Sequence, residues 1–337
     1  MKEKQHPELE KSELIKGMPA VCGNESAAVE FFEEQRWGGS PVCPHCGDKD
    51  VYQMKGRDGA RNARFLWRCR KCGEQYTVRT GAVYEDSKLP LRHWAFAFWR
   101  ACSSKKGCSA REIERQCSIS YKSALFLMHR VRFALTEDTT NAPKQGGDKV
   151  VEVDETYVGG KPRPTAFGAK PEAKATTGYR LGSKKIPVVA MVERGGKVRT
   201  KVVAKVTQKN LSQFLAENIQ VGSIVNTDQF GMYRSILWPI IRVEGGRHDV
   251  VNHSQKEYIR KNPDGTVSGV NHAESFFSLL KRGITGIFHA VSPEHLHRYC
   301  GEFTFRWDTR KMNDGERLAL AVKSSFGKRL EYADYVC

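Results

Sequence analysis

The sequence contains no apolar run that approaches the roughly 18 residues needed to cross a bilayer. Its beginning, MKEKQHPELEKSELIKG, is charged throughout and lacks the apolar segment of a secretory signal. These two absences disfavour membrane insertion and secretion. We therefore expect a cytoplasmic protein.

Cysteine is also scarce. Ten cysteines among 337 residues are too few for a fold held together by disulfides. Four of them fall in two CxxC pairs, which in a reducing compartment indicate a metal site. No internal repeat recurs along the chain, so a repeat architecture is not expected.

Acidic residues are too few to balance the basic ones. The chain has 38 Asp and Glu against 55 Lys and Arg, a formal net charge of +17. Such a surplus favours a polyanionic partner such as nucleic acid. Hydrophobic residues still make up 39%, which is enough for packed cores, and the length indicates two or more domains.

Changes in periodicity divide the chain. Helical spacing runs from Ser26 to Trp37 and through 90–135, whereas strand-like alternation begins after a polar, Gly- and Pro-containing segment. The predicted strands are 149–159, 186–193, 198–206, 222–230 and 248–253, with helices at 206–219 and 271–282 and a helical stretch from Pro293. The predicted organisation is an N-terminal helical segment (1–41), a cysteine module (42–82), a helical region (88–136), a linker (137–148), an α/β domain (149–312) with a basic loop at 161–185, and a C-terminal tail (313–337).

The cysteine module has the spacing of a structural zinc ribbon. A CxxC turn lets two thiolates reach one tetrahedral zinc ion, and the glycines after each pair, Gly47 and Gly73, relieve the strained backbone. A redox role for the CxxC pairs is the alternative, and His45 is an alternative ligand. The expected ligands are Cys43, Cys46, Cys69 and Cys72.

The helical region has the pattern of a helix-turn-helix. Ser109 and Glu112 form a capping box for a first helix, and Ser120 is placed to cap a second. Helix-turn-helix modules place the start of their second helix against DNA bases. The residues expected to contact DNA are Tyr121, Lys122, Ser123 and Arg130, with Arg132 also available for polar contacts. An ordinary helical hairpin with a basic solvated face is the alternative.

Three acids in the strand-rich half stand beside apolar sequence. Asp154 lies near the end of one predicted strand, Asp228 directly follows another, and Glu274 lies on a predicted helix. Acids placed in this way can converge on a pair of divalent ions that hold the oxygens of a phosphoryl transfer. Each acid taken alone is more often a solvated or capping residue.

Four segments together resemble the ISXO2-like DDE transposases of bacterial insertion sequences: the zinc ribbon, VDETYVGGK, NTDQFGMY and NHAESFFSLLKRGI; the stretch YCGEFTFRWDTRK is similar as well. The resemblance covers about 26–312 and implies a ribonuclease H-like α/β core. It also implies that Asp154, Asp228 and Glu274 hold catalytic Mg or Mn, and that the enzyme cuts element ends and joins them to target DNA.

The resemblance further implies double-stranded DNA as partner and at least a dimer on DNA, acting at the nucleoid. Lys281 and Arg282, beyond Glu274 on the same helix, suit a DNA phosphate, although a solvated helix end is the alternative. Glu152 and Glu155 are expected to tolerate Gln and to serve as internal controls. Two other functions remain open: a zinc-ribbon DNA-binding regulator with an inactive core, and a nuclease that cleaves without joining.

Overall fold

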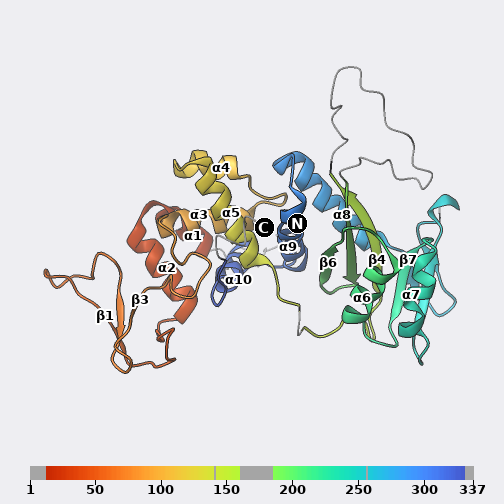
Figure 1. The fold of residues 1–337 in the computed structure, drawn as a ribbon, viewed down its shortest axis with the longest axis horizontal. Coiled ribbons are helices and arrows are strands. Elements are labelled where there is room, and N and C mark those ends of the chain that lie inside the picture. The colour runs from red at the N-terminus through yellow and green to blue at the C-terminus, as the bar shows by residue number, and fades with distance from the viewer. Residues whose placement is uncertain (1–12, 140–141, 160–184, 256, 331–337) are drawn as a thin grey trace, which may run out of the picture. The chain divides into compact units, whose positions relative to one another are not determined.

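The computed structural model describes residues 13–139, 142–159, 185–255 and 257–330. The chain forms two compact units (Figure 1), one made of the residues up to Glu137 and those from Thr309, the other of Asp138–Asp308. Among the described residues, no helix has both the length and the apolar character that a bilayer span requires. Most of the basic loop expected at 161–185 lies outside the described residues.

The N-terminal unit is built from helices around an aromatic core. Phe32 contacts the rings of Tyr84 and Phe98 edge to face, and Tyr84 also contacts Trp94. Its helices are α1 (Glu13–Gly23), α2 (Glu25–Trp37), α3 (Leu91–Ser103), α4 (Ala110–Cys117), α5 (Tyr121–Leu135) and α10 (Asp314–Lys323). Helix α1 lies within the N-terminal helical segment predicted at 1–41, although helical spacing in the sequence begins only at Ser26.

The C-terminal stretch is not a tail, which corrects the predicted boundaries of 149–312 and 313–337. Helix α10 starts with a capping box in which Asn313 and Glu316 bond reciprocally. Its apolar residues Leu318, Ala321 and Val322 follow helical spacing and are fully buried. Since that stripe must be covered, residues 309–330 pack into the N-terminal unit rather than extending the α/β domain.

The zinc ribbon is a small antiparallel sheet of β1 (Val51–Gln53), β2 (Trp67–Cys69) and β3 (Gln75–Tyr76). The rings of Trp67 and Tyr76 both meet Trp37 at the end of α2 edge to face. On α2, Glu33 accepts a hydrogen bond from the indole of Trp67 and pairs with Arg61. These contacts join the ribbon to the helix before it.

The α/β unit is a five-stranded mixed sheet in the order β6-β5-β4-β7-β8. Strands β4, β7 and β8 are parallel to one another, whereas β5 is antiparallel to both β4 and β6. The strands are β4 (Val151–Val158), β5 (Ile186–Glu193), β6 (Val198–Val202), β7 (Ile224–Asp228) and β8 (Arg247–Val251). All five were predicted from the alternation of apolar residues.

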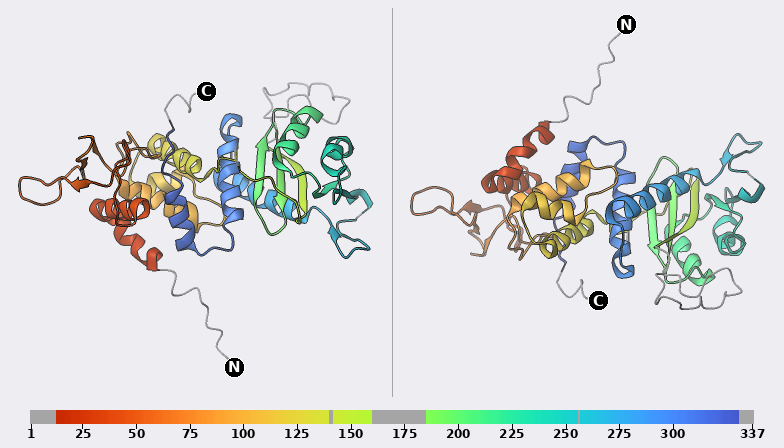
Figure 2. Two further views of the ribbon diagram at one scale, coloured as in Figure 1. Left: turned by 90° about the horizontal axis from the view of Figure 1, so that it is seen from below. Right: turned by 90° about the horizontal axis from the view of Figure 1, so that it is seen from above.

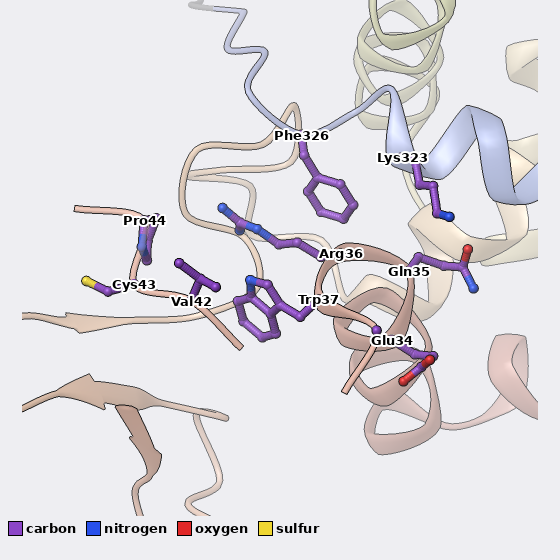
Figure 3. Close-up of a pocket in the computed structure, with 10 residues that line it drawn as sticks. Glu34, Gln35, Arg36, Trp37, Val42, Cys43, Pro44, Lys323 and Phe326 are labelled. Carbon is purple, nitrogen blue, oxygen red and sulfur yellow. The ribbon is translucent and has the colours of Figure 1, made fainter. Parts of the chain in front are cut away.

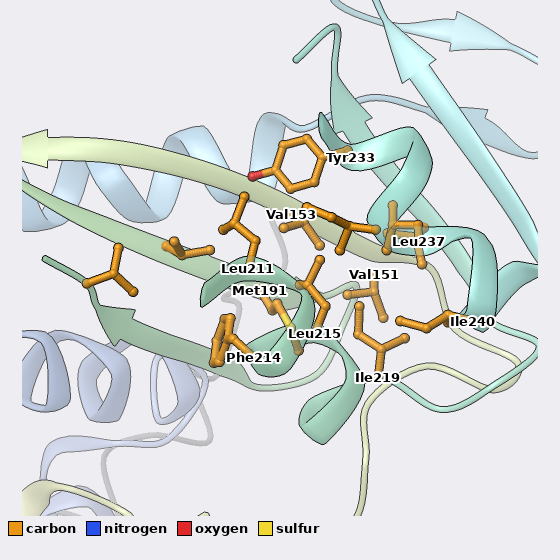
Figure 4. Packing of buried hydrophobic residues seen from close by; sticks show 14 residues of the cluster. Val151, Val153, Met191, Leu211, Phe214, Leu215, Ile219, Tyr233, Leu237 and Ile240 are labelled. Carbon is orange, nitrogen blue, oxygen red and sulfur yellow. The ribbon is translucent and has the colours of Figure 1, made fainter. Parts of the chain in front are cut away.

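Helices cover both faces of this sheet. Val153 and Met191 pack on one face against α6 (Gln208–Asn218) and α7 (Met232–Ile241), as Figure 4 shows. On the other face Val188 and Ala190 pack against α8 (Asn271–Gly283) and α9 (Leu296–Asp308) (Figure 2). Between β8 and α8 the chain forms a short hairpin of β9 (Arg260–Lys261) and β10 (Val267–Ser268).

Part of the expected linker belongs to the α/β unit. The boundary between the units falls after Glu137, but Gln145 is buried and its backbone donates to the carbonyl of Asn218 at 2.7 Å. Gly147 donates to the hydroxyl of Ser223. The polar composition of 137–148 predicted a spacer. The hydrogen-bond partners of this segment lie over seventy residues away in the sequence, so its composition alone could not indicate them.

Candidate active site and zinc ribbon

Two aspartates lie on the neighbouring parallel strands β4 and β7. Asp228 is the last residue of β7, whereas Asp154 lies in the middle of β4 and not near its end as the sequence predicted. Glu152 of β4 pairs with Asn226 of β7. Two residues further on, the same register places Asp154 level with Asp228, where sites in α/β sheets commonly open. Val153 packs on the face under α6 and α7, so the alternation of side chains directs Asp154 toward the face that α8 covers.

Glu274 approaches the same region from the first turn of α8. Its side chain is half exposed, and one carboxylate oxygen lies 3.5 Å from Nδ1 of His253. Phe276 and Leu280 are fully buried against the sheet and fix the helix in place. The helical spacing predicted in the sequence therefore separates an anchoring face from a face that carries the acid.

The acids influence one another electrostatically. Burial raises the pKa of Asp154 to about 7, and the charges of Glu155, Asp228 and Glu274 act in the same direction. Like charges near each other disfavour ionisation. The structure thus brings the three acids singled out in the sequence within electrostatic reach.

Glu155 is not the remote control residue that strand alternation suggests. The hydroxyl of Tyr233 on α7 donates to its carboxylate at 2.5 Å. Burial raises the pKa of Glu155, the hydrogen bond from Tyr233 opposes this rise, and the charge of Asp228 adds to it. Glu155 directly follows Asp154 on β4 and its charge raises the pKa of Asp154, so it is an electrostatic neighbour of that acid. Tyr233 was not recognised in the sequence, where no spacing marks it.

Glu152, the second intended control, is also misjudged by the sequence. Its side chain is fully buried and paired with Arg194 at 2.7 Å and with His272 at 2.9 Å. A buried carboxylate with charged partners does not tolerate neutralisation as a surface residue does.

The three acids offer donors suited to a hard divalent cation. Carboxylate oxygens are the ligands that Mg and Mn prefer. Among the described residues, however, the four cysteines are the one group of three or more His, Cys, Asp or Glu side chains whose ligand atoms lie within 4.8 Å of one another. The three acids therefore lie near one another without forming a complete set of metal ligands. A bound cation would relieve the electrostatic repulsion that the other acids exert on Asp154.

The cysteine cluster has the geometry of one tetrahedral metal site. Sγ of Cys43 lies 3.7 Å from Sγ of Cys72, and that of Cys46 lies 3.6 Å from Cys69. Four sulfurs at about 2.3 Å from a zinc ion are roughly 3.8 Å apart. The thiols lie close enough to share protons: the backbone amide of Cys72 lowers the pKa of Cys69, whereas the pKa values of Cys46 and Cys72 are raised.

The two glycines after the knuckles behave as expected. Gly47 and Gly73 have φ of 74° and 75°, a left-handed conformation that favours glycine. Each donates its N–H to the carbonyl of the first cysteine of its knuckle, at 2.9 Å and 3.1 Å.

Helices α4 and α5 occupy the two segments for which the sequence predicts a helix-turn-helix. Ser109 accepts a hydrogen bond from the N–H of Glu112, and Ser120 accepts one from Ser123. Tyr121 is exposed at the start of α5, and the guanidinium of Arg111 lies 4.0 Å from the centre of its ring. Lys122 is also exposed, so the start of α5 is open to a partner.

Arg130 is not available to DNA, which corrects the prediction. It is buried, and its guanidinium donates to the carbonyls of Val83, Glu85 and Leu330. Arg132 is buried as well. Both residues lie on polar positions of the predicted helix, but segments distant in sequence cover that face. Lys281 and Arg282, by contrast, are exposed in the last turn of α8.

An open cavity of about 710 Å³ lies beside the ribbon in the N-terminal unit (Figure 3). Arg36 crosses it between the rings of Trp37 and Phe326, at 5.4 and 5.1 Å from their centres. The same guanidinium donates to the carbonyls of Val78 and Thr80. Arg36 therefore ties the end of the ribbon to α2, and we assign this cavity a structural role.

Comparison with known families gives two matches. A family model described as an ISXO2-like transposase domain matches residues 145–308, and one described as a transposase zinc-ribbon domain matches residues 23–75. Together they cover more than half of the chain. The first contains all three acids and the second contains all four cysteines.

A relative covers nearly the whole chain. It is an uncharacterized protein in transposable element ISH50 of Halobacterium salinarum, 26% identical over 306 residues, or 90% of this chain and 97% of the relative. Two solved structures are more distant. The Mos1 strand transfer complex (12% identity, TM-score 0.22) covers 61% of this chain and 74% of its own, and a pre-cleavage Mos1 transpososome (14%, 0.21) covers 97% and 99%. TM-scores this low support no structural argument. The family assignment rests on the two family models instead: the chain belongs to the ISXO2-like transposase family.

Proposed function

We propose that this protein is a DNA transposase that binds the ends of an insertion sequence, cleaves them and joins them to target DNA. The proposal rests on the proximity of Asp228 and Glu274 to Asp154, on the face of the sheet that α8 covers, where their charges raise its pKa. The strand order supports a ribonuclease H-like core, since three parallel strands are extended by an antiparallel pair.

In this proposal the three carboxylates hold two Mg or Mn ions, which would polarise the scissile phosphate and activate the attacking oxygen. Asp154 presents its oxygens from the middle of β4, Asp228 presents its own from the end of β7, and Glu274 presents its own from the first turn of α8. Lys281 and Arg282, exposed on the same helix, contact the DNA backbone and orient it.

The N-terminal unit supplies DNA binding in this scheme. The ribbon, with its structural zinc, and the exposed start of α5 with Tyr121 and Lys122 recognise the element ends, and the net charge of +17 adds affinity for phosphate. The enzyme would act at the nucleoid as a dimer or larger assembly, because two ends must be joined.

A strand-transfer assay with element-end DNA tests this function. Asp154→Asn, Asp228→Asn and Glu274→Gln should each abolish cleavage and joining while leaving end binding near normal. Because the acids act as one unit, double substitutions should cost little more than single ones. Cleavage without joining by the wild-type protein would indicate a nuclease, and binding without either reaction would indicate a regulator. Either result would overturn the proposal.

A further inference from the structure

A buried polar layer lies directly beneath the three acids. Glu152 and Asn226 are paired across β4 and β7, and both side chains are fully buried. Each stands two residues before one of the aspartates, on the face that α8 covers. Because these positions are buried and polar, their hydrogen bonds must be made within the protein. Among the described residues, Oδ1 of Asn226 has no hydrogen-bond partner, so its Nδ2 makes the contacts of that side chain.

Glu152 bonds to the start of α8. One carboxylate oxygen accepts the backbone N–H of His272 at 2.7 Å and that of Ala273 at 3.2 Å. The other oxygen accepts a hydrogen bond from Nδ1 of His272 at 2.9 Å. Because a carboxylate can only accept hydrogen bonds, Nδ1 carries the proton. The residue before the helix, Val270, provides no side-chain cap. Glu152 therefore supplies from the neighbouring strand the N-terminal cap that the helix lacks.

Arg194 and Asn226 hold the segment that leads into the helix. Nε of Arg194 donates to Glu152 at 2.7 Å, while its two other nitrogens donate to the carbonyls of Val267 and Gly269. Nδ2 of Asn226 donates to the Gly269 carbonyl at 3.2 Å. The layer thus joins β4, the turn after β5, β7 and the chain before α8.

Each of the three acids lies two residues from a residue of this polar layer, so the layer can fix where the acids stand relative to one another. From Glu152 to Asp154 is two residues along a rigid strand, from Asn226 to Asp228 is two more, and Glu274 follows the capped His272 by two residues. Any shift of α8 relative to the strands at this layer moves Glu274 relative to both aspartates.

We propose that Glu152, Asn226 and Arg194 are positioning residues that set the distance between Glu274 and the two aspartates, and so the affinity of the three acids for a divalent ion. This inference rests on the proposed function, because it assumes that the acids bind metal. Groups that orient metal ligands typically change metal affinity 10- to 100-fold when they are altered.

The test measures Mn²⁺ binding to the full-length, zinc-loaded protein without DNA, from the electron paramagnetic resonance signal of free Mn²⁺. Glu152→Gln and Asn226→Ala should each raise the half-saturating Mn²⁺ concentration about 10-fold or more. Glu193→Gln is the matched control, since Glu193 lies on β5 next to Arg194 but bonds to Gly146 and Lys149 instead. It should bind Mn²⁺ as the wild type does.

Hydrogen exchange supplies a second readout. In Glu152→Gln the amides of His272 and Ala273 should exchange about 10-fold faster, while end-DNA binding stays unchanged. Glu152→Gln could fail to fold because Arg194 is left unpaired. In that case the double variant Glu152→Gln/Arg194→Met, which removes both charges, is tested in place of the single variant. A purely structural role would lower the melting temperature and leave the half-saturating concentration unchanged well below melting, which would overturn the proposal.

Asp154→Asn separates this inference from the proposed function. If Asp154→Asn binds Mn²⁺ as tightly as the wild type, the acids are not the metal site and the proposed function fails. If Asp154→Asn loses Mn²⁺ but both Glu152→Gln and Asn226→Ala retain it, the function stands and the positioning layer is refuted.

Discussion

Replacing Asp154 with Asn should inactivate the protein and yet stabilise its metal-free form at neutral and alkaline pH. Burial and three neighbouring acids raise the pKa of Asp154 to about 7. In the unfolded chain an Asp has a pKa of about 3.9. The native state therefore binds more protons between these values, and the stability contributed by Asp154 is complete below about pH 4 and lost as the pH rises to about 7.

The magnitude follows from that difference in pKa. A rise from 3.8 to about 7 corresponds to at most about 4 kcal/mol of lost stability once the group is ionised. We expect a loss of about 1 to 2 kcal/mol of stability, because Asp154 is partly exposed and nearby water and counterions screen its charge. The loss from the substitution itself is small, since Asn keeps the oxygen that accepts the N–H of Glu155 at 2.8 Å.

Calorimetry without divalent ions at pH 5 and pH 8 measures the effect. For a unit of this size, 1 to 2 kcal/mol corresponds to roughly 3 to 6 °C in the melting temperature of the α/β unit. The advantage of Asp154→Asn over the wild type should be larger at pH 8 than at pH 5. Added Mg²⁺ should raise the melting temperature of the wild type and not that of the variant.

Glu244→Gln, which changes an exposed acid after α7, is the control and should show little difference at either pH. An Asp154→Asn variant that melts below the wild type at pH 8, or an advantage that is equal at both pH values, would refute the argument that buried repulsion destabilises this site.

Three further predictions concern the other sites. Freshly purified, reduced protein should carry about one zinc per chain, and Cys69→Ser should lose it and destabilise the N-terminal unit while the α/β unit still melts normally; metal analysis without zinc would contradict this. Lys122→Ala should weaken end binding severalfold and reduce the slope of log affinity against log salt by about 1, whereas Arg130→Ala should lower stability by about 2 to 4 kcal/mol without changing that slope. In the strand-transfer assay, calcium should support binding to element ends but little cleavage, because it is larger and more loosely coordinated than magnesium.

The sequence predicted the strands and the acids for the same physical reason. Strands such as IPVVAMVE are rich in β-branched residues with apolar side chains, and an acid at the end of such a run marks where the strand reaches the edge of the sheet. Asp228 was found in this way, whereas Asp154 lies in the middle of β4 and not near its end as predicted. The cysteine spacing is equally local, because each CxxC turn brings its own two sulfurs together.

Features that depend on distant partners were not predicted. Arg130 occupies a polar position of a basic helix, and only the fold shows that the carbonyls of Val83 and Leu330, 47 and 200 residues away, cover it. Helix α10 was read as a tail because its apolar stripe is short and its partner α3 is about two hundred residues earlier.

The cap of α8 shows what an absence in the sequence can still indicate. The residues before the helix, Gly269 and Val270, offer no Ser, Thr, Asp or Asn to bond its first N–H groups. A helix that starts without a local cap needs one from elsewhere, and a helix that carries an active-site acid in its first turn needs its start fixed most of all. In the structure that cap is Glu152, two residues before Asp154 on β4. A missing local cap thus indicates that another segment holds the start of α8, and the fold identifies that segment as β4, which lies 120 residues earlier and carries Glu152.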